Sequence, residues 1–179
     1  MPLVYLSPST QEFNYFINNG TEEEWMNAIA DEIEGYLVAG GISFVRNTPD
    51  MTARSSIAQS NAVGADLHVA IHSNTSPDFL AGILQGPDIY YAPGSYYSYA
   101  MARILENNFK KIYPDESKVD IRPTDYLGEV LRTYAPAVLI EVAYHDNLED
   151  ALWIQNNINE IARAIAKSIF EYFGYPFRF

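Results

Sequence analysis

A carboxylate lies inside one of the most apolar segments of the chain. Residues 136–142 read Pro-Ala-Val-Leu-Ile-Glu-Val, the composition of a strand that is buried on both faces. Burying an ionised carboxylate costs several kcal/mol unless a partner compensates it. Glu141 therefore has two interpretations: a structural ion pair with an arginine such as Arg132, or a general base beside a metal-bound water. The second is the more specific hypothesis.

A histidine marks the end of another apolar strand. Residues 65–74 read Ala-Asp-Leu-His-Val-Ala-Ile-His-Ser-Asn, and the alternation of apolar residues stops at His72, where small polar residues begin a loop. In α/β sheets, ligand-binding side chains collect at the carboxyl ends of the strands, which is the position of His72. His68 shares the same strand face but lies four residues deeper, so we expect a hydrogen-bonded core histidine there.

Three glutamates open the first predicted helix, and one of them is expected to face the interior. Thr21 and Glu24 have the spacing of a capping box. The apolar stripe of the helix begins at Met26, and counting back four residues from it gives Glu22, whereas Glu23 and Glu24 point away. First-turn acids often serve the helix dipole alone, but a buried Glu22 requires a further partner.

The elements that must position these side chains follow from the apolar periodicity. Short β-branched or apolar runs predict strands, and the longer amphipathic patterns between them predict helices. We expect strands over residues 3–6, 42–46, 67–72, 89–92 and 138–142, and a final helix from about residue 157. This order predicts one α/β domain over residues 1–179, with a mostly parallel twisted sheet of about six strands and helices on both faces. In such a sheet Glu22, His72 and Glu141 can converge at one edge.

Composition excludes several classes of partner. The chain has 179 residues, 48% of them hydrophobic, which is enough for one buried core and short for two. Its formal net charge is -12, so the protein repels phosphate backbones and anionic membranes, and we expect neither nucleic acid nor membrane as a partner. Cysteine is absent, so a zinc site has only carboxylates and three histidines to use. No apolar run approaches the ~20 residues that span a bilayer.

Taken in order, these features resemble the zinc-dependent N-acetylmuramoyl-L-alanine amidases of the family often called amidase type 3. The resemblance covers nearly the whole chain. Its matching segments are residues 6–11, Glu22, 41–50, 60–61, 65–74, 86–91, 131–132 and 136–142, followed by Asn147 and Asp150. The resemblance implies a peptidoglycan hydrolase that uses zinc-activated water to cut the amide bond between N-acetylmuramic acid and the L-alanine of the stem peptide.

The resemblance also implies a role for each candidate residue. The family holds Zn²⁺ with His, Glu and His, and uses a glutamate on the last strand as the catalytic acid and base. Carried over, Glu22 and His72 are two metal ligands and Glu141 is the catalytic residue. The first ligand of the family follows the opening strand in an Asp-Pro-Gly-His-Gly-like turn. Here residues 7–11 read Ser-Pro-Ser-Thr-Gln, which places Thr10 at the ligand position, and a threonine hydroxyl is a poor zinc ligand.

A histidine elsewhere offers a replacement for that ligand. Residues 142–147 read Val-Ala-Tyr-His-Asp-Asn, with His145 where the family usually has an apolar residue. His145 shares strand parity with Glu141, and we predict it as the third zinc ligand. The alternative is that His145 supports a ligand or polarises the substrate. The predicted substrate-binding residues are Thr10, Gln11, Asn74 and Arg132.

Two other functions stay open, and so does the route to the substrate. The missing loop histidine also fits a non-catalytic peptidoglycan-binding or structural module that lost its zinc, and a third reading is a metal peptidase that cuts within the stem peptide.

The first residues lack the basic flank and long apolar stretch of a secretory signal. We therefore expect either a protein that is cytoplasmic before its release to the bacterial cell wall, such as an endolysin, or a trimmed domain of an exported enzyme. A monomer is expected.

Overall fold

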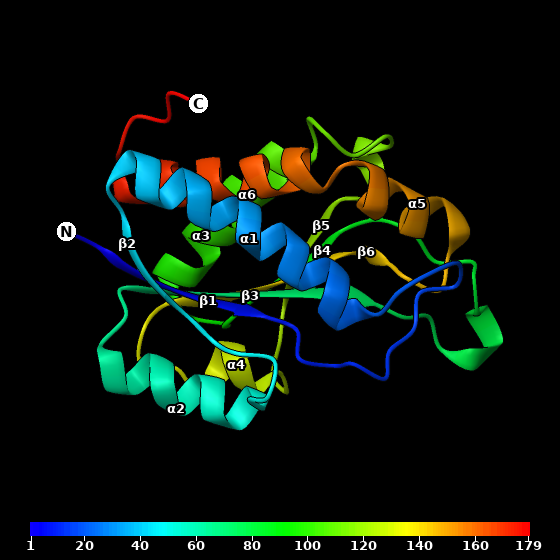
Figure 1. Cartoon of the computed structure of the whole chain (residues 1–179), viewed down its shortest axis with the longest axis horizontal. Helices are drawn as coiled ribbons and strands as arrows, with labels where there is room; N and C mark the ends of the chain where they lie inside the picture. The colour runs from blue at the N-terminus through cyan, green and yellow to red at the C-terminus, as the bar shows by residue number, and fades with distance from the viewer.

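Six strands form one mixed sheet in the computed structural model, which describes all 179 residues (Figure 1). The strands are β1 (Leu3–Pro8), β2 (Ser43–Arg46), β3 (Leu67–Asn74), β4 (Asp88–Tyr91), β5 (Asp120–Pro123) and β6 (Ala137–Tyr144). Their order across the sheet is β2-β1-β3-β6-β4-β5, and every neighbouring pair is parallel except β4 and β6. The predicted mostly parallel sheet in one α/β domain is therefore confirmed.

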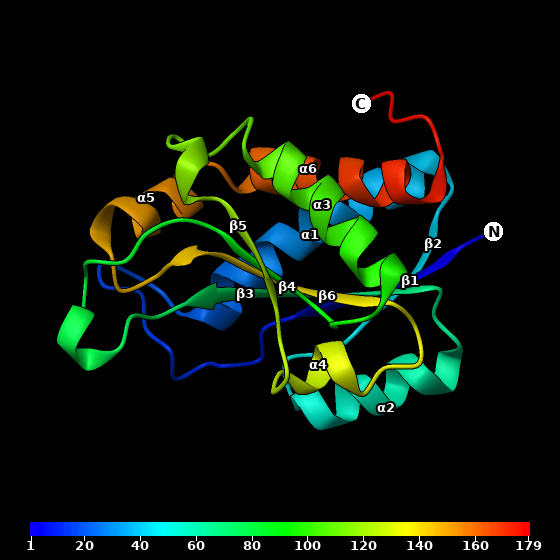
Figure 2. The ribbon, with the colours of Figure 1, turned by 180° about the vertical axis from the view of Figure 1, so that it is seen from behind.

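Helices cover both faces of this sheet. They are α1 (Glu22–Gly40), α2 (Ala53–Val63), α3 (Tyr96–Phe109), α4 (Gly128–Leu131), α5 (Leu148–Asn156) and α6 (Ile158–Phe173), with short 3₁₀ turns η1 (Asp78–Leu80) and η2 (Glu116–Lys118). Helices α1, α3 and α6 lie on one side of the sheet, and α2 and α4 lie on the other (Figures 1 and 2). None of these helices has the length and apolar character needed to cross a bilayer.

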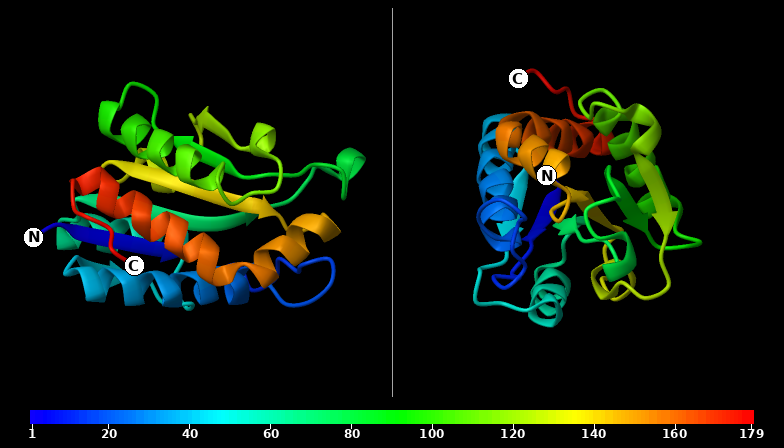
Figure 3. Two further views of the ribbon diagram at one scale, coloured as in Figure 1. Left: turned by 90° about the horizontal axis from the view of Figure 1, so that it is seen from above. Right: turned by 90° about the vertical axis from the view of Figure 1, so that its right-hand side faces the viewer.

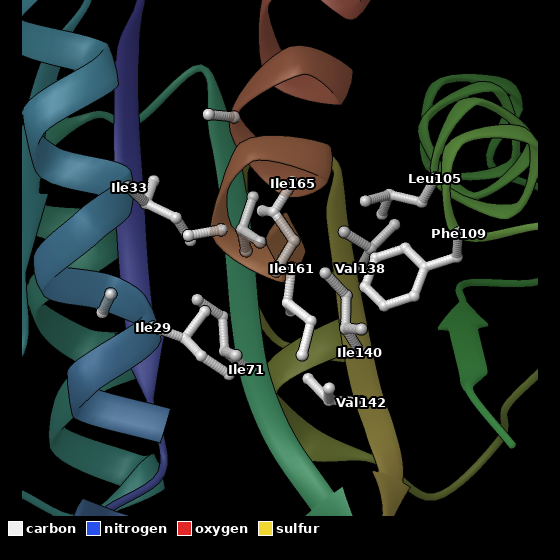
Figure 4. Packing of buried hydrophobic residues seen from close by; sticks show 14 of the residues in the cluster. Ile29, Ile33, Ile71, Leu105, Phe109, Val138, Ile140, Val142, Ile161 and Ile165 are labelled. Carbon is white, nitrogen blue, oxygen red and sulfur yellow. The ribbon is translucent and has the colours of Figure 1, made fainter. Parts of the chain in front are cut away.

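The main core lies between the sheet and the layer of α1, α3 and α6. Figure 4 shows its centre, where side chains from three helices meet those of β3 and β6. The labelled members are Ile29, Ile33, Ile71, Leu105, Phe109, Val138, Ile140, Val142, Ile161 and Ile165. Each such side chain contributes about 1.5–3 kcal/mol when it is fully buried. This layer therefore fixes α1 on the sheet and, with it, the position of the first turn of the helix.

The first turn of α1 lies at the edge of the sheet where the parallel strands end. In the left panel of Figure 3 the arrows of β1, β3 and β6 point toward this edge. The capping box predicted for Thr21 and Glu24 is present, with each side chain accepting a hydrogen bond from the other residue's backbone N–H. Because the cap sets where the helix begins, the stripe that continues in Met26 places Glu22 on the buried face, with a relative exposure of 1%.

Asp150 links the start of α5 to the end of β6 and to two loops. Its carboxylate accepts hydrogen bonds from the backbone N–H of Gly86 at 2.9 Å and of Tyr144 at 3.0 Å, and from the hydroxyl of Tyr113 at 2.6 Å. The side chain is buried. Removing it would leave three buried donors without an acceptor, and each unsatisfied donor is costly.

We expect Asp150→Ala to lower the free energy of unfolding by about 3 kcal/mol, measured by urea denaturation. The matched control is Asp125→Ala, because Asp125 is exposed. Its unfolding free energy should stay within about 0.5 kcal/mol of wild type. Equal destabilisation by the two variants would contradict the role of Asp150.

Candidate functional site

A row of acidic and basic side chains crosses the sheet near its carboxyl edge. Strand register pairs His72 of β3 with Glu141 of β6, and Glu141 with Asp88 of β4. Laterally paired residues project to the same face of a sheet. Here it is the face that α4 covers, because the small second core joins Val130 of that helix to the same faces of β3 and β6. The register thus places His72, Glu141 and Asp88 side by side on three neighbouring strands.

His72 lies between two carboxylates. Its Nδ1 is 3.0 Å from Oε1 of Glu22, and its Nε2 is 3.2 Å from Oε2 of Glu129. Burial on its own would lower the pKa of His72, but the hydrogen bonds to Glu129 and Glu22 outweigh it and raise the pKa well above its ordinary value. Both ring nitrogens therefore face anionic oxygens.

Glu22 is the acid that the helical count selected, and the structure brings it to His72. Oε1 also accepts a hydrogen bond from the backbone N–H of Ser73 at 3.3 Å, and Oε2 accepts one from Nδ2 of Asn14 at 2.7 Å. Burial would raise the pKa of Glu22, yet the hydrogen bonds with His72 and Asn14 lower it below the ordinary value. The carboxylate is held ionised in a buried position.

Glu141 lies in the same row without a hydrogen-bond partner for one of its oxygens. Its Oε2 is buried and unpaired. Burial, with Coulombic repulsion from Glu22, Asp88 and Glu129 added and attraction to His72 opposing, raises its pKa to about 7. The ion pair with Arg132, the structural alternative, is wrong, because the arginine is exposed and makes no salt bridge.

Glu129 belongs to the site and was not predicted. It is buried in the short helix α4, and its pKa is lowered because hydrogen bonds with His68 and His72 overcome the effect of burial. Oε1 accepts a hydrogen bond from Oγ of Ser7 and lies 3.2 Å from Nε2 of His68. The only sequence signal was indirect: a buried His68 needs a partner, but nothing singled out Glu129 among 23 acidic residues.

His68 is the core histidine that the strand pattern predicted. Its Nδ1 lies 3.0 Å from Oγ of Ser60, its Nε2 faces Glu129, and its ring stacks on Tyr5 with centroids 5.1 Å apart. The side chain is fully buried. His68 therefore joins the hydrogen-bond network beneath the site rather than its accessible surface.

His145 does not join Glu22 and His72. Its Nδ1 lies 3.0 Å from Oγ and 3.1 Å from the carbonyl oxygen of Ser73, and its ring stacks on Phe16. Burial lowers the pKa of His145. No three His, Asp or Glu side chains are arranged as a group that could hold a metal ion. The role of His145 as the third zinc ligand stays a prediction, and its contacts do not support it.

Two of the four predicted substrate-binding residues line the cleft beside His72. Thr10 and Gln11 border this cleft of about 410 Å³, which also contains Glu129, and Nε2 of Gln11 is 3.5 Å from Nδ1 of His72. Asn74 instead approaches Asp88, at 3.5 Å. Arg132 is exposed outside the cleft.

A larger cleft lies elsewhere on the molecule. It has a volume of about 840 Å³ and lies at the amino ends of the parallel strands, near Pro2 and Pro136. Its lining is mostly apolar, and Asp66 is its only carboxylate. The smaller cleft beside His72 is therefore the better candidate for chemistry.

The cluster of imidazole and carboxylates lies at the carboxyl edge of the sheet, where α/β domains place their ligand-binding and active sites. The sequence profile described as N-acetylmuramoyl-L-alanine amidase matches residues 11–171, so the chain belongs to this family.

Solved structures share the fold over almost the whole chain. N-acetylmuramoyl-L-alanine amidase AmiC2 of Nostoc punctiforme is 19% identical, with a TM-score of 0.85 and 97% of each chain covered. The catalytic domain of CwlV, an amidase from Bacillus (Paenibacillus) polymyxa var. colistinus, is 22% identical, with a TM-score of 0.84 over 98% of this chain and 100% of that one. The catalytic domain of the CD27L endolysin, which targets Clostridia difficile, is 16% identical, with a TM-score of 0.77 over 96% and 98% of the two chains. No curated protein matches the sequence.

Only two of the three protein donors that a catalytic zinc site uses meet in this chain. Glu22 and His72 meet through one carboxylate oxygen and one ring nitrogen, and the other ring nitrogen of His72 faces a carboxylate, as metal-bound histidines usually do. Three buried or partly buried glutamates surround one imidazole, and Oε2 of Glu141 lacks a partner. A cation would compensate this surplus of negative charge. No side chain of this chain takes the place of the family's third ligand beside Glu22 and His72.

Proposed function

We propose that this chain is a peptidoglycan hydrolase that cleaves the amide bond between N-acetylmuramic acid and L-alanine of the stem peptide, with Zn²⁺ held by Glu22 and His72. Family membership supports the reaction class. The observation that carries the proposal is the contact of His72 with Glu22 beside the unpaired, buried oxygen of Glu141. Residues 1–179 would form the catalytic domain and act at the bacterial cell wall.

Glu141 is the proposed acid and base. Its pKa of about 7 lets the carboxylate take a proton from the attacking water and return it to the departing amine of L-alanine at neutral pH. A zinc ion bound beside it would supply Lewis acidity toward the water and the amide carbonyl. Register holds Glu141 next to His72, so the base and the proposed metal ligand share one face of the sheet.

The remaining residues orient these groups or the substrate. His145 is proposed in its supporting role, because it contacts Ser73, whose backbone N–H donates to Glu22. Thr10 and Gln11 line the cleft and are proposed to contact the substrate. The substrate roles of Asn74 and Arg132 stay predictions.

Digestion of purified peptidoglycan tests the proposal. Mass spectrometry should find stem peptides that begin with L-alanine and glycan strands that carry free lactyl groups. Removal of metal with a chelator should lower the rate at least about 10-fold, and added Zn²⁺ should restore it. Fragments with new ends inside the stem peptide would instead identify a metal peptidase.

The absence of a third ligand beside Glu22 and His72 favours one other function, a peptidoglycan-binding module without catalysis. Such a module would sediment with intact cell walls and release no soluble fragments, with or without Zn²⁺. Release of lactyl groups by the wild-type protein, and its loss in the Glu141 variant described below, would exclude this alternative.

A further inference from the structure

The cleft beside His72 is lined mainly by neutral polar groups. Most of its side chains carry a hydroxyl or an amide, and none is a lysine or an arginine. Glu129 is its one carboxylate. The volume of about 410 Å³ falls in the range of about 300–1,000 Å³ that is usual for sites of small ligands. The lining therefore suits a neutral ligand that forms many hydrogen bonds.

Two polar atoms of the cleft have no partner within the protein. Asn47 is 5% exposed, and its Nδ2 donates to the carbonyl oxygen of Pro8 at 3.0 Å and to Oγ of Ser56 at 3.1 Å. These bonds fix the amide, while its Oδ1 accepts no hydrogen bond and is reached by solvent. The same holds for the hydroxyl of Thr10. Both atoms are free to pair with a ligand.

An aromatic ring lies at the rim of this polar cleft. Phe13 lines the cleft, and 69% of its surface is exposed. A sugar ring has faces of C–H bonds and a rim of hydroxyl groups. An exposed aromatic ring can stack on such a face, while neighbouring hydroxyl and amide groups bind the rim. The cleft thus offers the two kinds of contact that a sugar needs.

We propose that this cleft binds the sugar of the substrate, N-acetylmuramic acid with its lactyl carboxyl in amide linkage, and that Phe13 stacks on the sugar ring. The inference deepens the proposed function and rests on it for the identity of the sugar. In this linkage the sugar is neutral, whereas the stem peptide carries carboxylates. A lining with one carboxylate and no lysine or arginine offers those carboxylates no partner.

The position of the cleft on the sheet agrees with this assignment. It extends from His72 of β3 to Ser7 and Pro8 of β1, whereas Glu141 lies on β6, the other neighbour of β3. A sugar in the cleft would place the amide bond that follows its lactyl group beside His72 and Glu141. The stem peptide would then extend over β6 and β4, away from the cleft.

Sugar binding by the metal-free protein tests the role of Phe13. The probe is N-acetylmuramic acid amidated at its lactyl carboxyl, titrated while the amide NMR signals of the protein are recorded. We expect Phe13→Ala to weaken binding about 3- to 10-fold, and Phe13→Tyr to stay within about twofold of wild type because it keeps the aromatic face. Phe79→Ala is the matched control, since Phe79 is also exposed but lies in η1, outside the cleft. Equal affinities of F13A and F79A would overturn the inference.

A second probe separates the sugar from the peptide. L-alanyl-D-glutamate, an anionic start of a stem peptide, should neither displace the sugar probe nor shift the signals of Thr10 and Asn47. Displacement would assign the cleft to the peptide and reject the inference, as would a wild-type protein that hydrolyses peptidoglycan but does not bind the sugar probe.

The outcome for the proposed function is distinguishable from that for the cleft. If sugar binding depends on Phe13 but purified peptidoglycan is not hydrolysed, the proposed reaction fails and the cleft remains a sugar site. If peptidoglycan is hydrolysed, F13A should raise KM for soluble peptidoglycan fragments by the factor lost in sugar affinity and leave kcat unchanged. A fall in kcat with unchanged KM would contradict a role in sugar binding.

Discussion

Replacing Glu141 by glutamine is expected to lower kcat for peptidoglycan about 100- to 10,000-fold, the usual contribution of a general acid and base. Glutamine has nearly the same shape but cannot take the proton of water. Oε2 of Glu141 makes no hydrogen bond, so the substitution breaks no contact at this atom. Burial disfavours the charged form of this carboxyl and raises its pKa to about 7, so we expect the fold to accept the neutral side chain of glutamine.

Two measurements on E141Q separate a catalytic from a structural role. The rate of release of soluble fragments from labelled peptidoglycan should fall, while the midpoint of urea unfolding should stay at the wild-type value. Glu160→Gln is the control for loss of one acidic side chain, because Glu160 is exposed. If E141Q keeps more than about one tenth of the wild-type rate, Glu141 is not the acid and base.

Apolar periodicity located the elements that are buried, because burial is what the pattern records. The central strands β1, β3 and β6 and the stripe of α1 were predicted for this reason, and the helical count alone selected Glu22 from three adjacent glutamates. Strand β5 was not located. It lies at the edge of the sheet, and three of its four residues, Asp-Ile-Arg-Pro, are exposed, so the segment has no alternation to detect.

The parts of the site that the sequence did not reveal depend on contacts between distant segments. Glu129 meets His68 and His72 across 61 and 57 residues, from a helix too short for a periodic signal. The placement of His145 assumed that strand parity continues beyond Glu141, but β6 ends at Tyr144. Beyond the strand end, backbone turns rather than parity decide where a side chain points.

At the start of α1, replacing Glu22 by glutamine is expected to weaken zinc binding and lower the rate of hydrolysis by more than about 100-fold. The substitution removes the carboxylate whose Oε1 meets Nδ1 of His72. An amide is a weaker zinc donor than a carboxylate, and its NH₂ group would face donors at Asn14 or Ser73. Zinc content after dialysis and the rate on peptidoglycan measure the two effects.

The neighbouring Glu23→Gln variant provides the matched control. Glu23 lies in the same helical turn and loses the same charge, so any effect through the helix dipole or the net charge is equal in the two variants. Only the direction of the side chain differs, because Glu22 is on the buried stripe and Glu23 is not. Equal zinc content in both variants would show that Glu22 is buried for the packing of α1 alone. A loss confined to E22Q would show instead that zinc binding depends on the buried carboxylate of Glu22.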